Sequence, residues 1–147
     1  MTVDNSLRIE QAEEYSVKVI SERVRKWIER ADYDMQTAEA VHKAGRYIYS
    51  IFMCQQAIEK CLKALIAYDE GDLPPIHNLR RLAQLSKVLT ELDEDQLTKL
   101  DFLSHYYINA RYKEDIAELS KGITEDISRS FIDFSKETIQ WVSRRMK

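Results

Sequence analysis

The scarcity of helix-breaking residues constrains this chain most. Its 147 residues include only three glycines and two prolines, while Ala, Leu, Glu, Lys, Gln, Arg and Ile dominate and favour helix. A chain of this length normally forms one domain that buries about two thirds of its unfolded surface without metals or disulfides. The sequence therefore predicts an all-α domain of long helices joined by few loops.

Apolar residues recur at three- and four-residue steps, which is typical of amphipathic helices. The predicted helices span about 22–42, 46–68 and 78–89, then from TELDED at 90–95 up to the NARYKED turn, and finally 124–146. The helix at 46–68 is apolar on most sides and is therefore expected to be central. The helix at 78–89 is the shortest, with Leu79, Leu82, Leu85 and Val88 as its buried stripe.

Two glycine-containing breaks help to separate these helices. Gly45 ends the first helix, and Gly71 with the Pro74-Pro75 pair marks the clearest loop. Short connections between long helices favour antiparallel neighbours. We expect an up-and-down helical bundle of four main helices plus a short extra helix.

Charge and hydropathy exclude several classes of protein. The net charge of −3 gives no global attraction to duplex nucleic acid or to an anionic membrane. No run approaches the ~18 apolar residues of a membrane span, and the start, MTVDNSLRIEQAEEY, lacks an apolar signal core. A cytoplasmic location is the expectation.

The cysteines and histidines predict no metal site, and no cofactor is expected. Cys54 and Cys61 share one helix face but lie roughly 10 Å apart at about 1.5 Å per residue, too far for a disulfide. Both have apolar neighbours and are predicted to be reduced core residues. The histidines at 42, 77 and 105 are widely separated in the sequence.

Three polar features of the sequence are candidates for a functional site, and the first lies on the central helix. Gln56, Glu59, Lys60 and Lys63 form a polar strip on the central helix. This strip is either a ligand-binding surface or an exposed stripe with an i,i+4 pair between Glu59 and Lys63.

The second feature is His77, just at a predicted helix start. Free amides and the helix dipole favour a phosphate or carboxylate there. The alternative is structural: Asn78 caps the helix and His77 fixes the loop.

The third feature is the segment NARYKED at 109–115, which raises the question whether Arg111 binds a ligand or is a solvated surface charge. At about 100° per residue, His105 and Tyr112 share a helix face, whereas Arg111 lies about 120° from His105. Arg111 instead lines up with Ser104, Tyr107 and Ile108. His105 and Arg111 are therefore not a ready-made pair on one helix.

Several motifs together resemble a known family. They are Trp27 with RADYDMQTAEA, the GRY triplet at 45–47, FMCQQAIEKCLKALI, PPIHNL and INARYKED. Their order and spacing resemble the HEPN domain, the higher-eukaryote and prokaryote nucleotide-binding domain, over about residues 21–146. The chain resembles the small free-standing prokaryotic members, which are similar to the substrate-binding partners of minimal nucleotidyltransferases. We therefore expect residues 1–20 to form an arm or extra helix and 21–147 a HEPN-like helical bundle domain.

The resemblance implies a homodimer with a polar groove that binds a nucleotide or RNA. It implies a non-catalytic protein that acts with a separately encoded nucleotidyltransferase in a toxin–antitoxin-like module. The expected phosphate contacts are Arg111 and Lys113, with additional contacts from Lys60, Lys63, Arg46 and His77.

A ribonuclease toxin is the alternative function that the resemblance raises. Many HEPN ribonucleases carry an arginine followed four to six residues later by a histidine, but residues 112–118 after Arg111 contain none. Metal-independent RNA cleavage benefits from a group that exchanges protons near neutral pH, as histidine does. The alternative catalytic residues are Arg111 with Tyr112 and either His77 or His105. An oligomerisation module without ligand is the third hypothesis.

Tyrosines gather near Arg46 and the NARYKED segment, at positions 47, 49, 106, 107 and 112. A single bundle of this size is not expected to bury all of them. Aromatic residues with arginine are typical of interface cores. We predict a two-fold homodimer whose interface includes part of the Arg46 and Arg111 regions.

Overall fold

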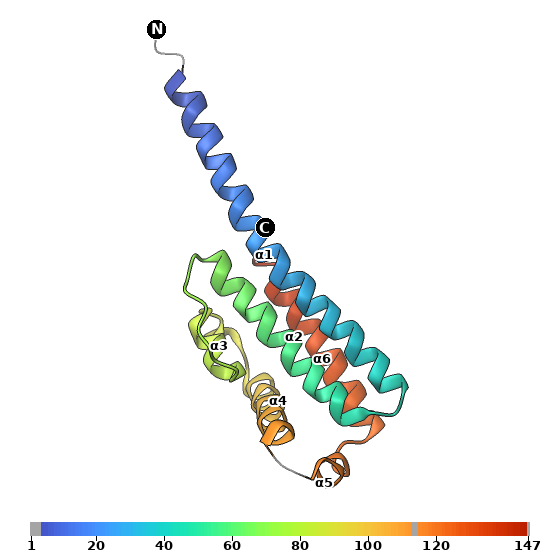
Figure 1. Ribbon diagram of the computed structural model, residues 1–147. Coiled ribbons are helices and arrows are strands. Elements are labelled where there is room, and N and C mark those ends of the chain that lie inside the picture. The colour runs from blue at the N-terminus through green and yellow to red at the C-terminus, as the bar shows by residue number, and fades with distance from the viewer. Residues whose placement is uncertain (1–3, 113–114, 147) are drawn as a thin grey trace.

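The computed structural model describes the backbone of residues 4–112 and 115–146, and the side chains of residues 22–112 and 115–146. Over these ranges the chain is all-α, with no strand (Figure 1). The helices are α1 (Asp4–Lys43), α2 (Tyr47–Tyr68), α3 (Leu79–Leu85), the 3-10 helix η1 (Leu89–Glu91), α4 (Glu94–Tyr112), α5 (Ile116–Ser120) and α6 (Glu125–Ser143). The predicted all-α helical bundle is confirmed.

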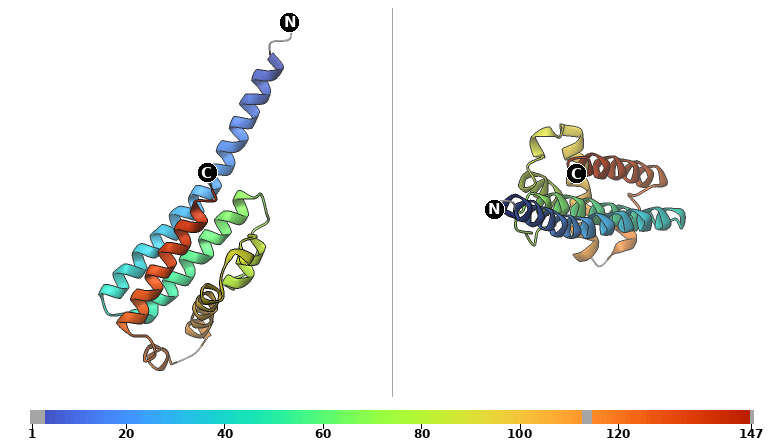
Figure 2. Two further views of the ribbon diagram at one scale, coloured as in Figure 1. Left: turned by 180° about the vertical axis from the view of Figure 1, so that it is seen from behind. Right: turned by 90° about the horizontal axis from the view of Figure 1, so that it is seen from above.

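Helix α2 is the centre of the bundle. Helices α1 and α6 lie along it, and α3 and α4 cover another side (Figures 1 and 2). Ile51, Ile58 and Leu62 of α2 are almost completely buried. The nearly continuous apolar surface of this segment requires neighbours on several sides, and the structure provides them.

Cys54 and Cys61 lie in this core as free thiols. Burial raises the pKa of both thiols to about 12, because a thiolate is poorly solvated among apolar side chains. They are reduced core residues, as predicted.

Helix α1 is longer than its apolar pattern indicated. Its backbone is continuous from Asp4 to Lys43, and its N-terminal part extends beyond the other helices (Figures 1 and 2). The helix therefore crosses the boundary predicted at residue 20. The division of the chain into an arm and a domain stays a prediction.

The predicted helix at 78–89 ends four residues early. Lys87 has a φ of 66°, and the Val88 amide donates to the Ala83 carbonyl oxygen at 3.0 Å, which closes the end of α3. Leu85 was expected in the buried stripe but is 38% exposed. Leu79, Leu82 and Val88 are buried as predicted. The prediction was wrong for Leu85 and for the helix end, because the chain turns at Lys87 and Val88 reaches the core from beyond α3.

A short helix, α5, follows NARYKED and was not predicted. It has five residues, and the Asp115 side chain accepts a hydrogen bond from the Glu118 amide at its start. A single turn is too short to show helical periodicity in the sequence. This helix packs against α2 and α4.

Candidate functional site

Arg111 lies in the last turn of α4, held by tyrosines. Its Nη1 donates to the Tyr107 hydroxyl at 2.9 Å. Its guanidinium carbon lies 5.3 Å from the centroid of the Tyr107 ring and 5.4 Å from that of Tyr112. No carboxylate of the described residues forms an ion pair with Arg111. The predicted alignment of Arg111 with Tyr107 is confirmed, and no acid among the described residues compensates the charge of the guanidinium.

Tyr107 links Arg111 to the rest of the bundle. Its buried ring stacks on Phe52 of α2, with centroids 5.0 Å apart. The His77 ring lies 5.5 Å away, in the loop before α3. The fold thus brings His77 and Arg111 to the same tyrosine although they are far apart in the sequence.

His77 is oriented by a buried polar network on α2. Its Nδ1 lies 2.9 Å from Glu59 Oε1. Gln55 Nε2 donates to the His77 carbonyl oxygen at 2.9 Å and to Glu59 Oε1 at 3.1 Å. The His77 side chain remains 46% exposed. One edge of the imidazole is therefore fixed by protein while the ring stays accessible to solvent.

Lys63 completes this network. Its Nζ lies 3.2 Å from Glu59 Oε2, and the two residues are 8% and 5% exposed, respectively. The i,i+4 pair considered in the sequence analysis exists, but it is buried instead of lying on an exposed stripe. The stripe is covered because the His77 loop packs over this part of α2.

Side chains already accept hydrogen bonds from backbone amides at the start of α3. The Asn78 side chain accepts a hydrogen bond from the Arg81 amide at 2.9 Å, and Ser104 Oγ accepts one from the Leu79 amide at 3.0 Å. This supports the structural interpretation of Asn78 as the cap and His77 as a residue that fixes the loop. Fewer free amides are then left at this helix start for an anion.

The remaining expected site residues lie elsewhere. Lys60 pairs with Asp34 of α1. His105 Nε2 contacts Asn109 Nδ2 at 2.9 Å, and no interaction within the described part of the chain joins it to Arg111. Lys113 lies outside the described residues.

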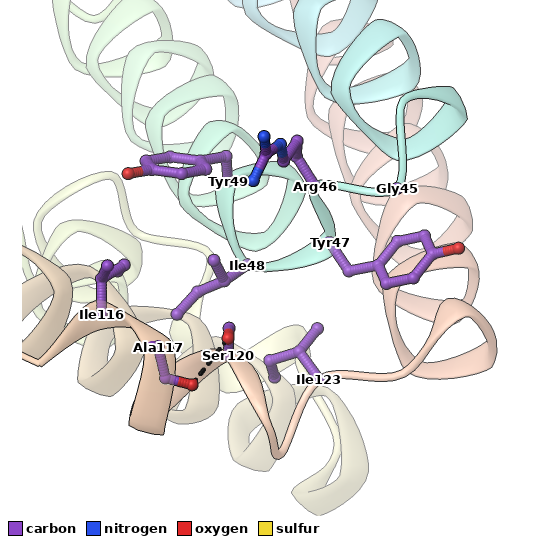
Figure 3. A pocket seen from close by; sticks show the side chains of 9 residues that line it. All are labelled: Gly45, Arg46, Tyr47, Ile48, Tyr49, Ile116, Ala117, Ser120 and Ile123. Atoms are coloured by element: carbon purple, nitrogen blue, oxygen red, sulfur yellow. Dashed lines mark hydrogen bonds between the residues drawn. The ribbon is translucent and has the colours of Figure 1, made fainter.

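Arg46 precedes α2 and lines a separate pocket of about 300 Å³ (Figure 3). The side chains of Ile48, Ile116 and Ile123 point into this space, while Arg46 lies beside Tyr49 at its edge. The pocket is thus mainly apolar inside, with an arginine at the rim. Arg111, Tyr107, Tyr112 and His77, with the Gln55, Glu59 and Lys63 network, are called the Arg111 cluster. The described contacts do not join Arg46 to this cluster.

A comparison with models of protein families identifies the family of this chain. The model of the HEPN domain matches residues 24–145. The chain belongs to the HEPN domain family. The resemblance drawn from the motifs is therefore confirmed over most of the chain.

Two solved structures are similar to this HEPN protein. The crystal structure of ST0689, an archaeal HEPN homologue, is 26% identical, with a TM-score of 0.68 over 84% of this chain and 98% of that chain. The crystal structure of TT1696 from Thermus thermophilus is 23% identical, with a TM-score of 0.65 over 83% of this chain and 97% of that chain. The second likeness supports the fold alone. No curated protein matches the chain.

Sequence reasoning missed two members of the Arg111 cluster. Gln55 was not considered at all, and Tyr107 was placed on the face of Arg111 but was not predicted to bind it. The i,i+4 spacing from Tyr107 to Arg111 was a usable signal for their contact. The contact of Gln55 with the His77 loop had no such signal because it joins residues 22 positions apart.

Two negative findings concern metals and membranes. Across the residues with described side chains, no group of three or more His, Cys, Asp or Glu residues is placed to hold a metal ion. None of the helices within the described ranges is long and apolar enough to cross a membrane.

Proposed function

We propose that this HEPN protein binds a nucleotide or RNA without cleaving it, and that Arg111 holds a phosphate group. The observation that carries this proposal is an exposed guanidinium held by Tyr107 and Tyr112, with no acidic partner among the described residues. A guanidinium binds phosphate through short, often bidentate, charge-assisted hydrogen bonds. Because Tyr107 already positions the side chain, binding costs less conformational entropy.

The neighbours of Arg111 suit the rest of a nucleotide. The Tyr112 ring is 72% exposed and lies against the guanidinium, where a base can stack on it. His77 offers a partly exposed imidazole on the other side of Tyr107. Lys113 is proposed as a second phosphate contact on its sequence position alone.

The other expected cations contribute less directly. Lys60 and Lys63 each have a carboxylate partner, so their charges are largely compensated. Arg46 stands at the separate pocket beside α5. We retain these three as additional contacts whose effect is expected to be smaller than that of Arg111.

A direct binding measurement tests the proposal. We expect a fluorescently labelled single-stranded RNA or nucleotide to bind with an affinity that falls as salt rises. Arg111→Ala should weaken binding at least about tenfold, since a charge-assisted hydrogen bond is lost. Arg80→Ala is the matched control, because Arg80 is equally charged and exposed but makes two bonds to Asp101, at 3.1 and 2.8 Å. An unchanged affinity of the Arg111 variant, or equal losses in both variants, rejects the assignment.

We further propose a separately encoded nucleotidyltransferase as the partner, in a toxin–antitoxin-like module. The support is the resemblance of the motifs to partners of minimal nucleotidyltransferases. A nucleotidyltransferase gene beside this one, and co-purification of the two products, are expected. If no such partner gene exists in the genome, this part of the proposal fails.

A metal-independent ribonuclease is the second candidate function, and one geometric observation favours it. Glu59 orients His77, whose ring packs on the tyrosine that binds Arg111. A histidine oriented by a carboxylate is a common arrangement for proton transfer. Cleavage of RNA in the presence of EDTA, lost in His77→Ala and Arg111→Ala, would support it. RNA that stays intact for hours although the protein still binds it rejects the ribonuclease. A protein that neither binds nor cleaves RNA would instead be an oligomerisation module.

A further inference from the structure

A second group of basic and aromatic residues lies on α1, outside the Arg111 cluster. Arg23, Lys26, Arg30 and Tyr33 follow one another at three- and four-residue steps, so they share one face of the helix. All four are exposed. Tyr33 is 70% exposed and is one of the most exposed large hydrophobic residues described.

The acidic residues nearby do not neutralise this face. Glu22 and Glu29 both form ion pairs with Arg25, which lies on a neighbouring stripe of α1. Asp34 is buried and pairs with Lys60 of α2. No acid of the described residues forms an ion pair with Lys26 or Arg30. The face therefore carries a local positive charge although the whole chain is acidic.

Lys26, Arg30 and Tyr33 of this face line a groove between α1 and α2. The groove has a volume of about 480 Å³ and is lined by Lys26, Glu29, Arg30, Tyr33, Asp34 and Lys60. The guanidinium carbon of Arg30 lies 5.3 Å from the centroid of the Trp27 ring, which packs against the core residues Val24 and Ala64. Arg30 is thus positioned by a partly buried side chain that packs against the core.

We propose that this groove is a second binding site and that it takes one nucleotide unit. Lys26 and Arg30 would hold the phosphate, and the base would stack on Tyr33. Uncompensated cations beside an exposed aromatic ring are the usual elements of a single-stranded nucleic acid site. The unit is either a free mononucleotide or one nucleotide of a strand, since both present the same phosphate and base.

The groove and the Arg111 cluster meet α2 at consecutive residues. Lys60 contacts α1 through Asp34, whereas Glu59 contacts the loop before α3 through His77. The two sites therefore use different residues on either side of α2. The new site shares only the class of ligand with the proposed function and does not require Arg111.

Variants of the intact chain test the site with three probes: AMP, a labelled single-stranded RNA of about ten nucleotides, and inorganic phosphate. Lys26→Gln/Arg30→Gln should weaken RNA binding about tenfold and reduce the slope of log affinity against log salt by about 0.7, for the one phosphate that both residues hold. Tyr33→Ala should weaken binding about tenfold, and Tyr33→Phe should restore it, since the phenyl ring still stacks. The control is Arg80→Gln, which removes an exposed charge that is paired with Asp101 and does not line the groove, so no acid beside the groove is released. The affinity of this variant should stay within about twofold.

The source of the nucleotide unit follows from which probe responds. Effects on AMP indicate a free nucleotide, and effects on the RNA alone indicate a strand; both support the site. If Arg80→Gln weakens binding as much as the double variant does, only diffuse charge is involved and the inference is overturned. The inference is also overturned if two results occur together: inorganic phosphate competes fully with AMP and RNA, and Tyr33→Ala does not change their binding. The groove would then hold a phosphate without a stacked base.

Arg111→Ala separates this inference from the proposed function. Loss of binding in Arg111→Ala without loss in Lys26→Gln/Arg30→Gln overturns the α1 groove and leaves the proposed function standing. The reverse pattern supports the groove and overturns the role proposed for Arg111. No binding of any probe overturns both. Far-UV circular dichroism of each variant verifies that the helices remain folded.

Discussion

Arg111 donates a hydrogen bond to the hydroxyl of Tyr107, one turn earlier on α4, so that an exposed charge is anchored on a buried ring. Tyr107 is itself held by its stacking on Phe52 of α2. The position of the guanidinium is therefore set by packing in the core, although the group points to solvent. This arrangement reduces the freedom that Arg111 loses when it binds a phosphate.

The first prediction concerns this anchor. Tyr107→Phe keeps the ring and its stacking but removes the hydroxyl that accepts the bond from Arg111. We expect nucleotide or RNA affinity to fall about three- to tenfold, while the free energy of unfolding changes by less than about 1.5 kcal/mol. Fluorescence anisotropy and urea denaturation measure the two effects. Tyr106→Phe is the control, and equal affinities of Tyr107→Phe and the natural protein contradict the anchoring role.

The second prediction concerns the buried carboxylate of Glu59. Its removal leaves the Lys63 ammonium buried without a counter-charge and takes an acceptor from Gln55 and His77. We expect Glu59→Ala to lower the free energy of unfolding by about 3–5 kcal/mol, measured by urea denaturation.

A double variant tests that cause. Glu59→Leu combined with Lys63→Met removes both charges and keeps similar volumes, so much of the lost stability should return. A double variant as unstable as Glu59→Ala would show that the unpaired lysine is not the main cause.

The third prediction is a pH dependence that arises between α1 and α6. Glu39 accepts bonds from Arg129 at 3.0 and 2.9 Å and another from Lys136, and these bonds lower the pKa of Glu39 from 4.5 to about 2. Because the folded pKa is the lower one, this stabilisation is present above about pH 4.5 and is lost as the pH falls toward 2. Glu39→Gln should cost about 1–3 kcal/mol at neutral pH.

Urea denaturation of both proteins over a pH series checks this prediction. The difference in unfolding free energy between the natural protein and Glu39→Gln should shrink between pH 4.5 and 2. Glu137→Gln, an exposed change on α6, should show no comparable difference at either pH. A constant difference across the series would mean that ionisation of Glu39 is not responsible.

The fourth prediction concerns the homodimer. Tyr49 and Ile108 are among the most exposed large apolar residues described, and they lie in the Arg46 and Arg111 regions. Their burial in a two-fold contact would remove apolar surface from water. Sedimentation at micromolar concentration should give twice the chain mass of 17.3 kDa.

Ile108→Glu should shift the dimer to monomer, because it places a charge in the proposed interface. Leu85→Glu also charges an exposed apolar position, on α3, and should leave the dimer intact. A mass of 17.3 kDa throughout the concentration range would reject the homodimer, together with any site that needs a residue from a second subunit.

Most of the local structure was predictable because it depends on residues close in the sequence. Apolar periodicity identified α2 as the central helix and located α2, α4 and α6 to within a few residues, but it missed the N-terminal half of α1, which begins at Asp4. The Asn78 cap, the Glu59–Lys63 pair and the contact of Arg111 with Tyr107 each join residues three or four positions apart. The ends of α3 and the single turn of α5 were missed because tertiary packing and one left-handed residue decide them.

The sequence by itself determined the fold class, the family and the face of α4 on which Arg111 lies. Only the tertiary structure decided that His77 meets Glu59 and Tyr107, that Lys60 meets Asp34, and that Lys63 is buried. These contacts depend on how each helix is rotated and how far it slides against its neighbours. Helical periodicity specifies which face is apolar, but the partner of each polar side chain at the edge of that face is set by the packing of the whole bundle.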